Sequence, residues 1–158
     1  KGFSRYASGQ DRLLVLIDYT KPSTEKRFYI LDLLQKKLLL STYVAHGRGS
    51  GDNYAVAFSN RPGSYQSSLG FFRTGGTYMG KNGYSLFLDG LEKGINDKAR
   101  ERAIVVHGAN YADPAVLKGQ QRLGRSLGCP ALPPDISKQV IDTIKGGVLL
   151  YIYGLNKA

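Results

Sequence analysis

The chain has little of the side chains that proteins use for cross-links and metal centres. Its 158 residues include one cysteine, Cys129, and two histidines, His46 and His107. A lone cysteine forms no internal disulfide, and three such residues are too few for the four ligands of a structural zinc site. No stretch approaches the roughly 18 consecutive apolar residues of a membrane-spanning helix. Residues 1–4 lack the apolar run of a signal peptide. We therefore expect no metal site and no integral membrane segment.

Acidic residues are also scarce. Lys and Arg total 22 against 12 Asp and Glu, which gives a formal net charge of +10. Such a charge attracts polyanions, among them nucleic acid, acidic lipid and anionic cell-wall polymer. The basic residues are spread along the whole chain, however, as is typical of a solvated surface. No RNP-like, zinc-finger or helix-turn-helix pattern accompanies them, so we expect no nucleic-acid partner.

Glycine and aromatic residues are frequent, with 20 Gly, 11 Tyr and 6 Phe. Chains with this composition favour β structure with many turns. We predict one mostly β domain over residues 1–158 with one or two short helices, its first three strands forming an antiparallel meander. The expected strands are 13–18, 27–32, 38–44, 53–58, 71–74, 84–88, 103–106 and 148–153, and the expected helical segments are 96–102, 113–118 and 135–145.

The single cysteine lies on a sequence that predicts a stiff turn. Gly128 permits tight backbone geometry just before Cys129, and Pro130 fixes φ just after it. Such a turn presents the sulfur and nearby N–H groups together, as attack on a carbonyl requires. Positive charge from Arg122 and Arg125 would lower the pKa of the thiol from about 8.5. The alternative is a buried, inert cysteine.

His107 supplies a candidate base. It follows the apolar run 103–106 and precedes Gly108, which places an imidazole at a strand end where a turn exposes it. A base on a strand and a thiol on a turn form a reasonable Cys–His pair. No carboxylate sits beside His107 in the sequence, so a backbone carbonyl such as that of Gly108 is the expected orienting group. The alternative is a strand-end histidine bound to backbone.

Two further aromatic side chains stay ambiguous. His46 also follows a strand and precedes a glycine, at the start of the Gly/Ser/Asn-rich stretch 46–69. A place at the edge of the pocket and an ordinary turn histidine both remain open. Tyr78, between glycines, either lines a groove or packs against its neighbours.

The site motifs resemble those of a known family. His107-Gly108 followed by Ser126-Leu127-Gly128-Cys129 resembles the L,D-transpeptidase (YkuD-type) catalytic domain, which carries a His-Gly element and then Ser-x-Gly-Cys. Residues 67–72 are similar to its Thr-Pro-x-Gly-x-Phe strand, and residues 146–151 to its final strand. The resemblance runs from about residue 13 to residue 153. It implies a single catalytic domain with a β-sandwich or barrel-like sheet.

Two positions depart from the family pattern. Leu127 stands where the family commonly has His, and Ala131 stands where it commonly has Arg two residues after the cysteine. The version Ser-Leu-Gly-Cys-Pro-Ala-Leu is similar to the murein L,D-transpeptidase catalytic-domain branch. Arg125 and Arg122 are the candidates for the role of the missing arginine.

The resemblance also implies an activity on peptidoglycan stem peptides. Cys129 would form a thioester with a tetrapeptide stem after its diaminopimelate residue, and an amine or water would then resolve it. Carbapenems, which resemble the acyl donor, would react too. The scheme needs no cofactor or metal, and the location implied is exported, in the periplasm or cell envelope. The residues expected to act are Cys129, His107 and Gly108 in catalysis, Gly128 and Cys129 as oxyanion donors, and Arg125, Ser126, His46, Arg122 and Tyr78 in substrate binding.

Three other interpretations remain open at this stage. A different cysteine acyl-transfer enzyme, such as a sortase-like transpeptidase or a thiol amidase, would keep Cys129 and His107 but use another donor. A non-catalytic cell-wall-binding domain would need neither residue. A basic β domain that binds nucleic acid would use the Tyr, Lys and Arg surface.

Overall fold

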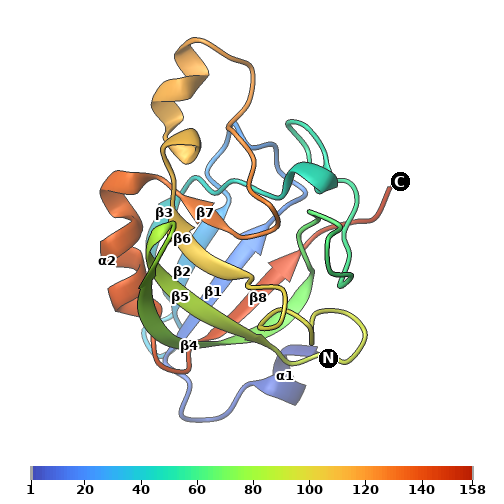
Figure 1. The fold of residues 1–158 in the computed structure, drawn as a ribbon. Helices are drawn as coiled ribbons and strands as arrows, with labels where there is room; N and C mark the ends of the chain where they lie inside the picture. Colours follow the sequence, from blue (N-terminus) through green and yellow to red (C-terminus); the bar gives the residue numbers. More distant parts are fainter. Residues whose placement is uncertain (1, 158) are drawn as a thin grey trace.

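One sheet of 8 strands forms the body of the protein in the computed structural model, which describes residues 2–157 (Figure 1). The strand order is β3-β2-β1-β8-β4-β5-β6-β7. The strands are β1 (Leu13–Asp18), β2 (Phe28–Asp32), β3 (Lys37–Thr42), β4 (Gly70–Gly80), β5 (Gly83–Gly90), β6 (Val105–Gly108), β7 (Ala131–Leu132) and β8 (Leu149–Tyr153). The helices are α1 (Gly2–Tyr6) and α2 (Pro134–Ile144), with 3-10 turns η1 (Arg48–Ser50), η2 (Asn110–Ala112) and η3 (Pro114–Lys118).

The sheet nearly closes on itself. Strands β1 and β8 pair in parallel, as do β6 and β7, and the other neighbours are antiparallel. Beyond the end of β3 the chain reaches the opposite edge, where Ala45 bridges Ala131 and Gly47 bridges Ser126. The prediction of a mostly β, barrel-like sheet with one or two helices is confirmed. Residues 45–47 therefore lie against the segment that carries Cys129 and pair with it on both sides of the cysteine.

The apolar pattern of the strands explains which side chains enter the core. In β1, Val15 and Ile17 are fully buried, as the period of two in an extended strand requires. Helix α2 packs on β5 and β6 and buries Val140, Ile141 and Ile144 at positions three and four apart, which is one helical face. No helix within residues 2–157 is long and apolar enough to cross a bilayer.

Two predicted elements are wrong. Residues 53–58 form no strand, because the N–H groups of Val56 and Ala57 both donate to the carbonyl of Ser50. Residues 96–102 form turns and no helix. There the buried amide of Asn96 donates to the carbonyls of Leu69 and Phe71. A polar side chain that binds distant backbone in this way competes with helix formation. The other predicted strands are present. The strand predicted over 71–74 continues six residues further, to Gly80, and the other strand ends are shifted by at most two residues.

Candidate active site

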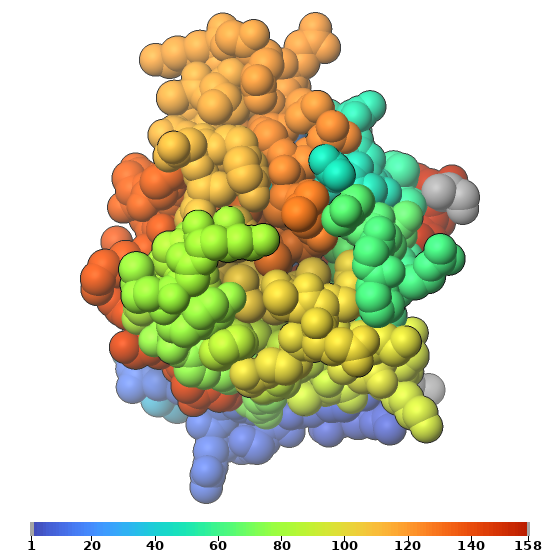
Figure 2. Space-filling view, in the orientation of Figure 1, coloured from blue at the N-terminus to red at the C-terminus, as the bar shows by residue number. Residues whose placement is uncertain are grey.

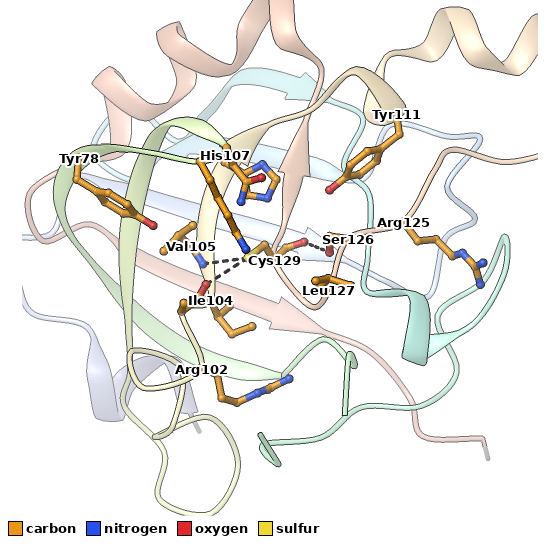
Figure 3. Close-up of a pocket in the computed structure, with 13 residues that line it drawn as sticks. Tyr78, Arg102, Ile104, Val105, His107, Tyr111, Arg125, Ser126, Leu127 and Cys129 are labelled. Atoms are coloured by element: carbon orange, nitrogen blue, oxygen red, sulfur yellow. Dashed lines mark hydrogen bonds between the residues drawn. The ribbon is translucent and has the colours of Figure 1, made fainter. Parts of the chain in front are cut away.

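A pocket of about 350 Å³ opens beside the end of β6 (Figure 3). Its lining brings together five residues that the sequence singled out, Cys129, His107, Ser126, Arg125 and Tyr78. They come from separate parts of the chain, since Tyr78 belongs to β4, His107 to β6 and the other three to the segment before β7. Gly108 lines an adjoining hollow. The fold therefore assembles a cysteine, a histidine and a cation around one cavity.

The turn that carries Cys129 depends on Gly128. Gly128 has a φ of +127°, a backbone conformation that residues other than glycine rarely adopt. A Cβ there would also lie 2.9 Å from Cδ1 of Ile104. The hydroxyl of Ser126 closes the turn, since Oγ donates to the carbonyl of Cys129 at 2.6 Å and accepts from the N–H of Gly128 at 3.1 Å. The glycine and the serine of the motif thus have structural reasons to be there.

The thiol of Cys129 is buried and held by backbone groups. Only 8% of Cys129 is exposed. The N–H of Val105 donates to Sγ, and Sγ–H donates to the carbonyl of Ala103, both at 3.4 Å. Burial raises the pKa of the thiol above its ordinary value, although the Val105 N–H and the charges of Arg102 and Lys81 act in the opposite direction. The free thiol is therefore protonated at neutral pH.

The imidazole of His107 is oriented by the next carbonyl. Its Nδ1 lies 2.9 Å from the carbonyl oxygen of Gly108. Because that oxygen only accepts, Nδ1 carries the hydrogen and Nε2 is left as the basic nitrogen. Burial lowers the pKa of His107, and the hydrogen bond to Gly108 opposes this shift. A neutral imidazole with a free Nε2 is the state that a general base requires.

The structure places two of the expected substrate-binding residues outside the lining of this pocket. His46 is 1% exposed, with Nδ1 2.9 Å from the guanidinium of Arg27 and Nε2 3.2 Å from the carbonyl of Gly51. Burial and then the charge of Arg27 lower the pKa of His46 to about 4. Arg122 donates to the carbonyl of Leu123. His46 is thus a neutral support behind the cysteine segment, since its carbonyl accepts from the N–H of Ser126 at 2.9 Å.

Among residues 2–157, three cations line the pocket and no Asp or Glu does. Arg125 pairs with Asp52 at 3.1 Å, and its terminal nitrogen also donates to the carbonyl of Gly51 at 3.3 Å. Sequence reasoning missed the other two, Arg102 and Lys81, and nothing in a chain with 22 basic residues distinguishes Arg102 from the rest. The glycines that flank Lys81 at 80 and 83 were the available signal, since they indicate a tight turn that can project a side chain.

Comparison with known proteins identifies the family of this chain. A family model described as the L,D-transpeptidase catalytic domain matches residues 1–153. This chain belongs to that family. No curated protein sequence matches it.

Several solved structures share the fold of this domain. The helical cell shape determining protein Pgp2 from Campylobacter jejuni (K307A mutant) has a TM-score of 0.61 at 16% identity, over 96% of this chain and 50% of that chain. An L,D-transpeptidase from Stackebrandtia nassauensis has a TM-score of 0.57 at 14% identity, over 99% of this chain and 62% of that chain. An L,D-transpeptidase from Mycobacterium smegmatis has a TM-score of 0.54 at 13% identity, over 90% of this chain and 59% of that chain. The present chain thus spans less than two thirds of the length of these structures.

Proposed function

We propose that this L,D-transpeptidase domain transfers the acyl group of a peptidoglycan tetrapeptide stem through a thioester on Cys129. The observation that carries the proposal is the shared pocket of Cys129 and His107, with Nδ1 of the imidazole held by Gly108. Family membership supports the reaction class and the peptidoglycan substrate. An exported location, in the periplasm or cell envelope, follows from such a substrate and is part of the proposal.

In the first half of the reaction, Nε2 of His107 takes the proton of the Cys129 thiol. The thiolate attacks the carbonyl carbon of diaminopimelate, and an S–C bond forms while the carbonyl oxygen becomes an oxyanion. The N–H of Cys129 has no acceptor among residues 2–157, whereas that of Gly128 is engaged by Ser126. The Cys129 N–H is therefore the first donor to the oxyanion, an interaction worth roughly 3 kcal/mol in the transition state.

In the second half, the C–N bond breaks and the imidazolium of His107 returns its proton to the leaving amine, D-alanine. An amine of a second stem, or water, then attacks the thioester. The same imidazole takes the proton of this nucleophile, and the Cys129 thiol is restored. With an amine the net reaction is crosslinking, and with water it is L,D-carboxypeptidase action. The neutral resting state of both groups suits this sequence, because His107 first passes the thiol proton to the leaving amine and then passes the proton of the nucleophile back to the thiolate.

Intact-mass spectrometry tests the proposal. We expect a tetrapeptide stem and a carbapenem each to add covalent mass to the wild type and none to Cys129→Ala. His107→Gln should acylate at least about 100-fold more slowly, the contribution expected of a general base. A structure titled as an L,D-transpeptidase in complex with imipenem has this fold, with a TM-score of 0.53, which motivates the carbapenem. A wild type with a reduced thiol that gains no mass would refute the acyl-enzyme.

A further inference from the structure

Two of the three cations of the pocket, Arg102 and Arg125, already bind other groups of the protein. The two terminal nitrogens of Arg102 donate four hydrogen bonds, to the carbonyls of Ser59 and Gln66 and the hydroxyls of Ser64 and Ser68. This fixes the guanidinium against the loop 59–68.

Arg125 is bound to the carboxylate of Asp52 and neighbouring carbonyls, as described above. A substrate carboxylate would therefore have to displace existing bonds at Arg102 or Arg125.

Lys81 differs from both. It occupies, with Asn82, the two-residue turn between β4 and β5, where Gly80 pairs with Gly83. Its side chain is exposed and forms no ion pair or hydrogen bond within residues 2–157. Lys81 lines both the pocket of Cys129 and the adjoining hollow beside Gly108. In Figure 2 the light-green hairpin borders the same face as the orange segment that precedes β7. An unpartnered ammonium thus stands at the mouth of the site.

The position of Lys81 also fits a particular part of a donor peptide. Lys81 and Cys129 line the same pocket, and the positive charge of Lys81 favours the thiolate there. In a donor that loses its last residue, the terminal carboxylate lies only three bonds from the carbonyl carbon that the thiol attacks. A cation near the sulfur is consequently near that carboxylate. Ala131 is fully buried beneath the site, so the position two residues after the cysteine supplies no cation for the task.

We propose that Lys81 is a specificity-determining residue that binds the terminal carboxylate of the acyl donor. This inference rests on the proposed function for the identity of the donor. The ligand class is a carboxylate carried within three bonds of the reacting carbon, whatever molecule presents it. A free chain end is thereby selected over an amidated or extended one, and the turn that holds Lys81 determines how far from the sulfur the end is bound.

The first test uses two peptides that differ only in this carboxylate. A tetrapeptide stem with a free C-terminus and its C-terminal amide are compared by the rate of acyl-enzyme formation at low donor concentration. We expect the wild type to prefer the free acid, and Lys81→Met to reduce that preference by about fivefold, the upper range for an exposed ion pair. Lys81→Arg should keep most of the preference. Lys93→Met, which removes an exposed lysine outside this pocket, is the matched control.

The second test needs no peptide. Iodoacetate and iodoacetamide alkylate a thiol by the same displacement of iodide, but only iodoacetate carries a carboxylate next to the reacting carbon. The ratio of interest is the rate of Cys129 alkylation by iodoacetate divided by the rate with iodoacetamide. Lys81→Met should lower this ratio about fivefold and Lys81→Glu should lower it further, whereas Lys93→Met should leave it unchanged. A ratio within twofold of the wild type in Lys81→Met would overturn the inference. Absence of peptide acylation with a changed ratio would instead refute the proposed function alone.

Discussion

Arg27 provides the sharpest test of how the site is supported. This arginine is fully buried, and no carboxylate within residues 2–157 pairs with it. Nε and one terminal nitrogen donate to the carbonyl of Val44 at 3.0 and 2.6 Å, and the other donates to the carbonyl of Lys21 at 3.0 Å. The guanidinium also contacts His46 and lies 4.8 Å from the ring of Tyr19. Burial lowers its pKa to about 10, so it stays charged at neutral pH.

Replacing this side chain by an apolar one removes the donor from two buried acceptors and one partly buried acceptor. In Arg27→Leu these are the carbonyls of Val44 and Lys21 and Nδ1 of His46. Each unpaired acceptor costs about 1–3 kcal/mol, while removal of the buried charge returns its desolvation free energy. We expect a net loss of about 4 kcal/mol in the free energy of unfolding, a large share of the about 5–15 kcal/mol of a typical domain.

Urea unfolding measures this loss directly. With a slope of about 2 kcal/mol per molar urea, the midpoint of Arg27→Leu should fall by about 2 M. Arg12→Leu is the control, because the Arg12 side chain is 65% exposed and its ion pair with Asp32 is long, at 3.7 Å. Its urea midpoint should stay within about 0.3 M of the wild type. The segment after Val44 backs the cysteine segment, so iodoacetamide should also reach Cys129 faster in Arg27→Leu. A midpoint unchanged within about 0.5 M would refute this account of the buried cation.

Two pH dependences follow from the buried groups. Because burial raises the pKa of Cys129, alkylation of the free enzyme by iodoacetamide should increase with a midpoint above pH 9.0; a plateau already reached at pH 7 would indicate a resting thiolate instead. Because His46 has its pKa lowered from 6.5 to about 4, the unfolded state binds the proton first as the pH falls. The free energy of unfolding should then drop by about 3 kcal/mol between pH 6.5 and 4. Urea midpoints measured across this pH range should fall less in His46→Gln than in the wild type. An equal fall with pH in both proteins would contradict the assignment of the effect to His46.

The strands could be predicted because local pattern and burial agree in them. Val15 and Ile17 alternate with less buried residues in β1, and α2 places Val140, Ile141 and Ile144 on one face. The failures lie where a distant contact overrides local preference. The polar run 96–102 has the composition of a helix, yet the amide of Asn96 is used to bind backbone of β4 and the residue before it. No local pattern encodes that contact.

The proposed catalytic pair, Cys129 and His107, was accessible to sequence reasoning for a different reason. With one cysteine and two histidines, the candidates were few, and the glycines beside Cys129 and His107 indicated turns. The supporting residues were not accessible. An arginine at the start of a strand is usually exposed, so the burial of Arg27 had no signal. Lys81 had only its flanking glycines, and its distance from the thiol depends on the long-range pairing of β4 with β5 and of β5 with β6.

The pocket thus separates two uses of positive charge. Arg102 has both terminal nitrogens engaged by the loop 59–68, so it cannot rotate to a substrate, and its charge continues to favour the thiolate of Cys129 after a donor binds. Lys81 has no partner within residues 2–157, and a bound carboxylate would neutralise its charge and cancel its action on the thiol. Activation of the nucleophile therefore cannot depend on Lys81 once the donor is in place. In the proposed reaction it depends on His107, whose neutral Nε2 would accept the proton, with Arg102 as the cation that remains.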